Sequence, residues 1–510
     1  MLSVLASVPT FALEGVDARE VTVEVDARRG LPAFTVVGLP DTAVREARER
    51  VRSALLNSGL EFPLQRLTVN LAPAWVRKAG ASFDLAIAVG VLAASGQVPP
   101  EALEGMAVSG ELSLGGALRP VRGALPIALG CRAAGLRRLV VSPEIAGEAA
   151  LVGELEVCSV PSLTRLVDLL HDRWKPDSPS PRTSRPVGPA AAPPDLADVR
   201  GQADARRALE IAAAGGHSLL MIGPPGAGKT MLARRLPGIL PPPTIEEALD
   251  ITRVQSVTGN SSGGLASERP FRAPHHTISA QGLVGGGSRP RPGEVTLAHR
   301  GVLFLDELAE FARPALEALR QPLEHGSVDI FRGQVGLSFP ARVLLAAAAN
   351  PCPCGIGGDR CECGVLTRER YRARLSGPLI DRIDLVCQLA PLPALALAAD
   401  SAAGESSAAV RARVVAARER QAARLAASAA TCNAELSAGA TRLLVPLTAK
   451  ASRPLAAALD TGVLTGRGHD RVLRVARTIA DLAGRQRVGR DDIAEALGYR
   501  AVAPGRTAAG

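Results

Sequence analysis

The stretch Ser218-Leu-Leu-Met-Ile-Gly-Pro-Pro-Gly-Ala-Gly-Lys-Thr230 joins an apolar run to a glycine-rich loop that ends in lysine and threonine. The apolar run predicts a buried strand, and the loop has the pattern of a phosphate-binding loop. In such loops the glycines let backbone N–H groups approach the phosphates, the lysine supplies a positive charge, and the threonine hydroxyl binds Mg²⁺. The sequence therefore predicts ATP and Mg²⁺ as cofactors, bound by Gly223, Pro224, Pro225, Gly226, Ala227, Gly228, Lys229 and Thr230.

Two further apolar stretches end in polar residues, as the strands of a nucleotide-binding sheet do. Residues 301–305 (Gly-Val-Leu-Phe-Leu) are followed by Asp306 and Glu307, and residues 342–349 are followed by Asn350. A carboxylate at a strand tip can hold Mg²⁺ through water, and the next carboxylate can orient an attacking water. We therefore expect Asp306 to serve the metal, Glu307 to orient water and Asn350 to position it. For Asn350 an Asx turn that ends a strand is the alternative.

Arg382 lies between two acidic residues in Ser376-Gly-Pro-Leu-Ile-Asp-Arg-Ile-Asp384. One interpretation is a surface ion pair, which contributes little to stability. The other is that in a ring-forming ATPase this guanidinium reaches the γ-phosphate held by the neighbouring subunit. The residues alone leave both interpretations open.

Composition divides the 510 residues into four parts, which is compatible with about three domains and a linker. Residues 173–197 are rich in Pro and Ser and predict the linker. Strand-like and helical stretches alternate in residues 1–172 and again in residues 198–395, whereas residues 396–510 show the three- and four-residue apolar spacing of helices. The predicted fold class is α/β with a helical C-terminal domain.

Charge and apolar content bear on location and partners. The net charge of +9 gives weak support to an anionic partner such as nucleic acid. The short apolar stretch at the N-terminus has no basic segment before it, so it does not have the pattern of a secretory signal. The longest apolar runs fall short of the roughly 18 residues of a spanning helix. We expect a cytoplasmic protein that does not partner a membrane.

Four of the eight cysteines are clustered as Cys352-Pro-Cys354 and Cys361-Glu-Cys363. Glycines between the two pairs permit a tight fold, so a tetrahedral zinc site is the natural interpretation in a reducing compartment. Cys-x-Cys is a less usual half-site than Cys-x-x-Cys, and free thiols or labile disulfides are therefore the alternative.

The order of these motifs resembles the AAA+ ATPases of the magnesium-chelatase and replicative-helicase branch. Further stretches resemble the ComM/YifB family over essentially the whole chain, namely residues 38–50, 271–277, 318–324, 350–355 and 474–482. This resemblance implies a homo-hexameric ATPase that drives branch migration of DNA during homologous recombination in natural transformation. It also implies a P-loop AAA+ core and a helical lid of the magnesium-chelatase C-terminal type.

The resemblance assigns roles to several polar residues. It implies Asp306 and Glu307 as metal and water residues, Asn350 as first sensor and Arg382 as a finger that acts on the neighbouring subunit. Arg467 is the implied second sensor from the lid, with Arg471 and Arg474 as the alternatives.

Residues 326–339 alternate around Phe331-Arg-Gly333 and predict a β-hairpin. Helicases that the chain resembles place a hairpin here that points into the ring pore, so Phe331 and Arg332 are candidate DNA contacts. Arg289 and Arg291, in the Gly-rich insertion 285–293, are further candidates for holding backbone phosphates. Ordinary solvated loops are the alternative.

The N-terminal part, residues 1–172, resembles the proteolytic domain of Lon-type proteases, which is similar to domain 2 of ribosomal protein S5. Ser82 in Lys78-Ala-Gly-Ala-Ser-Phe-Asp84 stands at the nucleophile position, but Leu125 stands where the family has its lysine. A serine without a neighbouring base is a poor nucleophile, so we expect this domain to be proteolytically inactive.

The leading functional hypothesis is a DNA-stimulated ring ATPase that moves branched DNA junctions. The alternative from another class is a chelatase-type ATPase that remodels a protein partner without touching DNA. Stimulation of ATP hydrolysis by DNA distinguishes the two.

Overall fold

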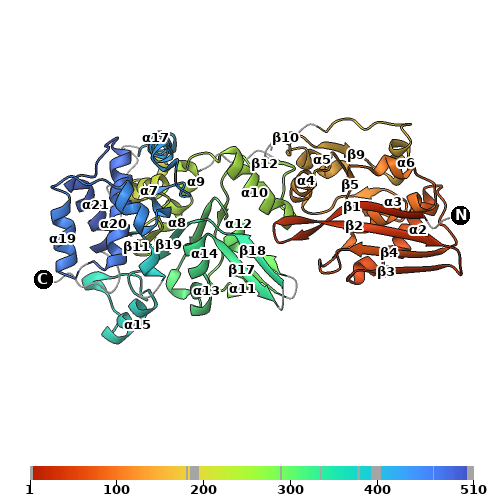
Figure 1. Cartoon of the computed structure of the whole chain (residues 1–510). Helices are drawn as coiled ribbons and strands as arrows, with labels where there is room; N and C mark the ends of the chain where they lie inside the picture. The colour runs from red at the N-terminus through yellow and green to blue at the C-terminus, as the bar shows by residue number, and fades with distance from the viewer. Residues whose placement is uncertain are drawn as a thin grey trace. The chain divides into compact units, whose positions relative to one another are not determined.

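The computed structural model describes residues 4–179, 182–183, 194–287, 290–332, 335–375, 379–391, 404–462 and 464–501. The chain divides into two compact units (Figure 1). The first combines Met1–Pro189 with Ala248–Ser267, and the second combines Ala190–Glu247 with Glu268–Gly510. The sequence pattern had placed residues 248–267 with the nucleotide-binding core, whereas in the structure they cluster with the N-terminal unit.

The first unit contains two main sheets. A four-stranded sheet has the order β1-β2-β4-β3, formed by β1 (Val4–Glu14), β2 (Asp17–Arg28), β4 (Arg66–Ala72) and β3 (Ala33–Val37). A parallel three-stranded sheet has the order β5-β8-β9, formed by β5 (Met106–Val108), β8 (Arg138–Val141) and β9 (Glu156–Ser159). The short strand pairs are β6 (Glu111–Leu112) with β7 (Leu118–Arg119), and β10 (Arg182–Thr183) with β12 (Gly264–Leu265).

Helices cover these sheets because their apolar faces need a partner. They are α1 (Thr42–Arg45), α2 (Ala47–Asn57), α3 (Asp84–Ala94), α4 (Ala124–Ala133), α5 (Pro143–Ala149) and α6 (Leu163–Leu170), with the 3₁₀ turn η1 at Ala81–Phe83. Every residue of α3 is buried, and this helix packs on β1 and β2. The alternating residues Val21, Val23 and Val25 of β2 are fully buried, as a half-buried strand requires.

The second unit is built on a parallel five-stranded sheet with the order β13-β16-β19-β11-β20. Its strands are β13 (Phe271–Arg272), β16 (Val302–Leu305), β19 (Leu344–Ala349), β11 (Leu219–Ile222) and β20 (Leu385–Gln388). All residues of β11, β16 and β19 are buried, which explains why their sequences are continuous apolar runs.

The second unit also contains helices and two short strand pairs, most of which are labelled in Figure 1. The helices are α7 (Ala203–Gly215), α8 (Lys229–Ala233), α9 (Leu236–Ile239), α11 (Ala280–Val284), α12 (Glu294–Leu297), α13 (Arg313–Ala318), α14 (Arg320–His325) and α15 (Val365–Leu375). Helix α10 (Ile245–Thr258) begins in this unit and continues in the first. Two short antiparallel pairs complete it, β14 (Gly285–Gly286) with β15 (Arg291–Pro292) and β17 (Ser327–Arg332) with β18 (Val335–Pro340).

The C-terminal region is helical, as the sequence predicted. It comprises α17 (Ser407–Leu425), α18 (Ala438–Leu444), α19 (Ser452–Asp460), α20 (Gly466–Leu482) and α21 (Arg490–Ala501). Helices α17 and α20 both pack on α7, so this lid shares one apolar core with the sheet. The mixed α/β class with a parallel sheet and a helical C-terminal region is confirmed. Within the described residues, no helix is both long and apolar enough to cross a membrane.

A buried polar network joins the lid to the start of two strands. His217 precedes β11, and its Nδ1 lies 3.0 Å from Asp384, which precedes β20. Its Nε2 lies 2.8 Å from the Thr478 hydroxyl of α20. Burial alone raises the pKa of the Asp384 carboxyl, but the hydrogen bond with His217 and the charge of Arg474 lower it to about 2. The lid is therefore anchored at the amino end of the strands.

A second cluster lies within the lid around Asp481, which is 1% exposed. Its carboxylate accepts hydrogen bonds from Arg424 at 2.7 and 2.8 Å and lies 3.0 Å from the guanidinium of Arg477, which is equally buried. Asn433 donates to the same carboxylate at 2.9 Å. Removing this carboxylate would leave a buried guanidinium without its counter-charge.

We predict that Asp481→Ala lowers the free energy of unfolding by about 3–5 kcal/mol, the typical cost of breaking a buried ion pair. Asp491→Ala, on the exposed first turn of α21, is the matched control and should change stability little. Chemical denaturation followed by circular dichroism measures both. Equal denaturation midpoints for the two variants would contradict a stabilising role for the network.

Candidate nucleotide-binding site

The loop 223–230 leaves the carboxyl end of β11 and leads into α8, which begins at Lys229. Gly226 and Gly228 have φ values of 78° and 90°, a left-handed conformation that side chains disfavour. Gly223 approaches the backbone of Leu389 so closely that a Cβ atom there would lie 2.9 Å from its carbonyl oxygen. The glycines are thus required by the conformation of the loop, and a loop of this kind can present backbone N–H groups to an anion.

A pocket of about 410 Å³ lies between this loop and the tips of β16 and β19. Parallel strands present their carboxyl ends at one edge of a sheet, and ligands bind there in open α/β folds. The lining residues are Pro225, Gly226, Ala227, Gly228, Lys229, Thr230, Met231, Asp306, Glu307, Ala349 and Asn350.

Residues that the sequence predicted from three separate strand tips contact one another in this pocket. The Lys229 ammonium donates to Asn350 Oδ1 at 3.0 Å and to the carbonyl oxygens of Gly223 at 2.6 Å and Pro224 at 3.0 Å. Burial lowers the pKa of Lys229 from its usual value, against the opposing charges of Asp306 and Glu307. Its position among the strand tips puts a cation where phosphates would bind.

Thr230 and Asp306 provide a pair of oxygen ligands suited to Mg²⁺. The Thr230 hydroxyl donates to Asp306 Oδ2 at 2.6 Å, and both residues line the same pocket. Mg²⁺ prefers oxygen ligands and is bound in such sites by one or two protein groups together with phosphate oxygens. The donor set therefore fits the predicted metal.

Glu307 also lines the pocket but makes a contact that the sequence did not suggest. Its backbone is left-handed, with φ of 53°, and its carboxylate lies 3.1 Å from Nδ1 of His276. His275 contacts Thr277, whereas His276 reaches the strand tip, and only the fold brings it there.

Arg382 lies away from the pocket of its own chain. Its backbone carbonyl accepts a hydrogen bond from the hydroxyl of Ser218 at 3.1 Å, and Ser218 precedes β11, whereas the phosphate loop follows that strand. Its side chain forms an ion pair with Glu324 of α14. Four strand residues at about 3.3 Å each separate Ser218 from the phosphate loop. The backbone of Arg382 thus lies near the amino end of β11, whereas the phosphate loop lies at the carboxyl end of that strand.

The three arginines considered for the second sensor have different surroundings. Arg471 and Arg474 both face the buried Asp384, at 3.5 and 3.9 Å, and Arg474 also donates to the carbonyl of Ala434 at 2.6 Å. Arg467 is exposed on the first turn of α20. Arg471 and Arg474 thus take part in anchoring the lid.

The predicted hairpin is present as β17 and β18, with Arg332 opposite Val335 at its end. Phe331 is 81% exposed. Arg291 is exposed on β15. The β14–β15 pair lies beside β17, as the close approach of Gly285 to Ile330 shows. Arg289 lies outside the described residues.

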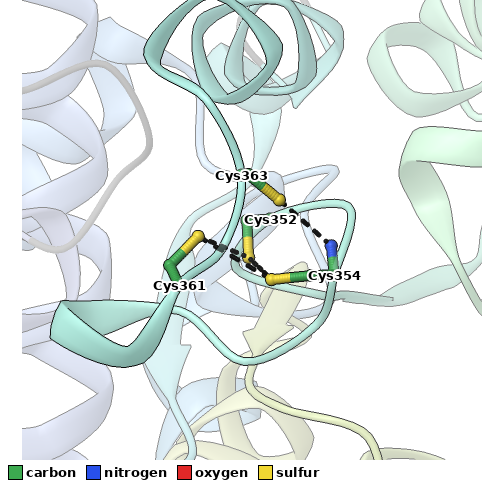
Figure 2. A group of neighbouring side chains, drawn as sticks. All are labelled: Cys352, Cys354, Cys361 and Cys363. Atoms are coloured by element: carbon green, nitrogen blue, oxygen red, sulfur yellow. Dashed lines mark hydrogen bonds between the residues drawn. The ribbon is translucent and has the colours of Figure 1, made fainter.

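The four clustered cysteines converge in the loop that follows Asn350 (Figure 2). Their sulfur atoms all lie within 4.8 Å of one another. The separate distances are 3.2 Å between Cys352 and Cys354, 3.7 Å between Cys354 and Cys361, and 3.4 Å between Cys361 and Cys352. None of the four forms a disulfide.

In the first unit, Ser82 lies in η1 and is partly exposed. Leu125, at the position of the protease lysine, is fully buried, and its N–H donates to the Glu148 carboxylate at 3.0 Å. Lys78 is also buried, and its ammonium donates to the carbonyl of Pro73. Burial lowers the pKa of Lys78. Among the described residues, no hydrogen bond joins Ser82 Oγ to a basic side chain.

Comparison with known proteins agrees with this architecture. Family models match residues 195–397 (magnesium chelatase, subunit ChlI), 23–145 (subunit ChlI of Mg-chelatase) and 404–500 (magnesium chelatase, subunit ChlI C-terminal). The chain is 44% identical to the competence protein ComM of Haemophilus influenzae, covering 98% of both chains. It is 43% identical to the uncharacterized protein YifB of Escherichia coli, covering 98% of this chain and 97% of the other.

Two more distant relatives share about a quarter of the chain. Lon protease 2 of Bacillus subtilis is 29% identical over 153 residues, which is 28% of this chain and 28% of the protease. The DNA replication licensing factor MCM3 of Gallus gallus is 27% identical over 137 residues, which is 27% of this chain and 14% of the factor. The similarity to the first agrees with a Lon-like part of the fold.

We predict that Lys229→Ala weakens binding of a fluorescent ATP analogue by roughly 100-fold. The reason is that Lys229 is the only lysine among the residues that line the described pocket, so its loss removes the ammonium that would contact the phosphates. Lys450→Ala removes an exposed lysine of the lid and is the matched control. Fluorescence titration with Mg²⁺ present measures both affinities. If Lys229→Ala binds the analogue like the control, this pocket is not the nucleotide site.

Proposed function

Because the chain belongs to the ComM/YifB family of magnesium-chelatase-like AAA+ ATPases, we propose that it is a ring-forming motor that uses ATP hydrolysis to drive branch migration of recombining DNA. The observation that carries the proposal is the similarity to a competence protein along nearly the whole chain. The resemblance to the ComM/YifB family implies recombination of DNA in natural transformation, so the substrate we propose is single-stranded or branched DNA.

The strand-tip residues support the hydrolytic part of the proposal. Lys229 and Thr230 would hold the phosphates and Mg²⁺ with Asp306, Glu307 would orient the attacking water, and Asn350 would sense the γ-phosphate. ATP supplies the free energy of the motor, and Mg²⁺ neutralises charge on its phosphates when bound. His276 would hold the Glu307 carboxylate in place, since the two groups lie 3.1 Å apart.

The position of Arg382 supports a ring. An arginine that lies near the amino end of β11 cannot serve the phosphates bound at the carboxyl end of the same strand. In a closed ring the same arginine can serve the pocket of the next subunit, and six subunits are the number that the family resemblance implies. Arg467 is our proposal for the second sensor, because Arg471 and Arg474 are engaged by Asp384.

The hairpin supports contact with DNA. Phe331 is exposed at the end of β17, where it could stack on a base, and Arg332 is the neighbouring cation for a backbone phosphate. Arg291 on the adjacent β-strand pair would bind a further phosphate, and Arg289, which lies outside the described residues, stays a candidate from the sequence. The net charge of +9 is compatible with an anionic partner.

A protein-remodelling ATPase that does not bind DNA is the alternative, and the chelatase names of the matching family models favour it. Proteolysis is not part of our proposal, because Leu125 replaces the lysine that would activate Ser82. The deciding experiment measures ATP hydrolysis without DNA and with single-stranded, duplex and forked DNA at fixed salt. Stimulation by forked DNA, with movement of the junction, is expected. Equal rates in all four conditions would favour protein remodelling.

We predict that Arg382→Ala binds ATP normally but hydrolyses it at least about 100-fold more slowly, because transition-state charge loses its partner from the next subunit. Glu307→Gln should also bind ATP and should accumulate as stable rings. Nucleotide binding, ring size and steady-state hydrolysis are measured for both. Normal hydrolysis by Arg382→Ala would exclude it as the finger.

Mixing these two variants tests whether Arg382 acts on a neighbouring subunit. The Arg382→Ala subunit retains Glu307, and the Glu307→Gln subunit retains Arg382. In an equal mixture about a quarter of the interfaces regain both groups by random assortment, so partial activity should return. Each variant mixed with itself is the control. Action within one subunit predicts no recovery.

We predict that Arg332→Ala lowers DNA affinity and reduces the slope of log affinity against log salt by about 0.7–0.9, because one phosphate contact is lost. ATP hydrolysis without DNA should stay nearly normal. Arg442→Ala, an exposed arginine of α18, is the matched control. Unchanged DNA binding by a correctly assembled Arg332→Ala ring would remove the hairpin from the mechanism.

A further inference from the structure

The cysteine cluster has a geometry that free thiols do not explain. Cys352 is 2% exposed, yet its sulfur lies 3.2 and 3.4 Å from two other sulfur atoms. A disulfide would need about 2.05 Å, so these distances are too long for a bond. Four sulfur atoms that all lie within 4.8 Å of one another instead surround one common point. Figure 2 shows the sulfurs of Cys352, Cys354 and Cys361 facing one another.

That spacing fits one tetrahedral metal ion. Zinc–sulfur bonds of about 2.3 Å in a tetrahedron place the sulfurs about 3.8 Å apart. The separations among Cys352, Cys354 and Cys361 are 3.2, 3.4 and 3.7 Å, at or somewhat below this value, and all four sulfurs lie within 4.8 Å of one another. An iron–sulfur cluster would spread the same four ligands over two or more iron atoms and needs a wider arrangement. Tetrathiolate coordination in a compact site favours Zn²⁺.

Backbone N–H groups donate hydrogen bonds to two of the sulfurs, as groups around the ligands of a metal site commonly do. The N–H of Gly357 donates to Cys352 Sγ at 3.3 Å, and the N–H of Cys354 donates to Cys363 Sγ at 3.4 Å. Such N–H donors stabilise negative charge on metal-bound sulfur. Gly355 and Gly357 have φ of 81° and 67°, which lets the chain turn sharply between the two cysteine pairs.

The same loop is attached to the nucleotide pocket at three points. Cys352 follows Asn350 by two residues, and Asn350 accepts the hydrogen bond from Lys229. Gly355 packs so closely on the phosphate loop that a Cβ atom there would lie 2.7 Å from Pro225. Two residues after Cys363, α15 begins; burial raises the pKa of its Tyr371 hydroxyl, and the backbone of Asn350 lies close enough to lower that pKa in part.

We propose that Cys352, Cys354, Cys361 and Cys363 bind one Zn²⁺ ion, and that this ion holds Asn350 and Pro225 in the positions needed for ATP turnover. The metal is structural: it cross-links the loop whose two ends meet at Asn350. Its loss frees the loop to move, and displacement of a catalytic group by about 1 Å can cost up to 100-fold in rate. The coupling part of this inference rests on the proposed ATPase activity, whereas the metal site does not.

The metal site is tested on the full chain purified without chelator. Elemental analysis should find about one zinc per chain in the wild type and in Cys131→Ser, whose thiol is buried in the first unit. Cys363→Ser should lose most of the zinc. Wild-type chain that is reloaded with Co²⁺ should show the visible bands of tetrahedral cobalt thiolate. Less than about a tenth of an equivalent of zinc, or iron in its place, would overturn the site.

The coupling is tested by ATP hydrolysis without DNA and by binding of a fluorescent ATP analogue. Cys363→Ser should hydrolyse ATP at least about 10-fold more slowly than Cys131→Ser, with circular dichroism confirming that both are folded. Tyr371→Phe should keep its zinc yet lower the hydrolysis rate several-fold, because only the link to Asn350 is cut. Wild-type rates in a zinc-free Cys363→Ser chain would overturn the coupling.

These outcomes are separable from those that test the motor. Zinc content is measured without nucleotide or DNA. The zinc site can therefore be confirmed even if DNA does not stimulate ATP hydrolysis. Failure of DNA to stimulate hydrolysis would overturn the DNA motor and leave the metal inference standing. Absence of zinc would overturn the metal inference and leave the motor standing.

Discussion

The site depends on parallel pairing of β19 with β16 on one side and β11 on the other. The register places Leu305 beside Ala347 and Ile222 beside Ala349, so the residues that follow these strands emerge at one edge. Every residue within the three strands is buried, which excludes polar groups from them and confines the chemistry to their ends. Lys229, Asp306 and Asn350 can therefore meet although more than a hundred residues separate the first from the last.

The carboxyl and amino ends of the strands in this sheet carry different groups. The carboxyl end carries the phosphate loop and its oxygen partners. At the amino end His217 and Asp384 bind the lid through Thr478, and Ser218 holds the backbone of Arg382. A change at the phosphates can reach Arg382 through the strands between them, and it can reach the lid both through these strands and through α9, which packs on α17. Such strands are rigid, which suits the motor that we propose, in which one subunit would respond to the nucleotide of another.

The loop after Asn350 adds a constraint from outside the sheet. A strand tip that continues into an irregular loop would hold its last residue loosely. Here the loop returns to Asn350 through Tyr371 and rests on Pro225, and its four thiols gather at one point. Asn350, which accepts the hydrogen bond from Lys229, is thus joined directly to the loop that carries the four cysteines.

The sequence by itself determined the strand tips, the phosphate loop, the hairpin and the helical lid, because each is encoded by local spacing and by the need of buried strands to be apolar. It also indicated the thiol cluster, whose members lie within twelve residues of one another. Only the tertiary structure decided the pairing of His276 with Glu307, the engagement of Arg471 and Arg474 by Asp384, and the membership of residues 248–267 in the first unit. Each of these joins groups that are distant along the chain. Local periodicity carries no record of such contacts, since the packing of whole elements creates them.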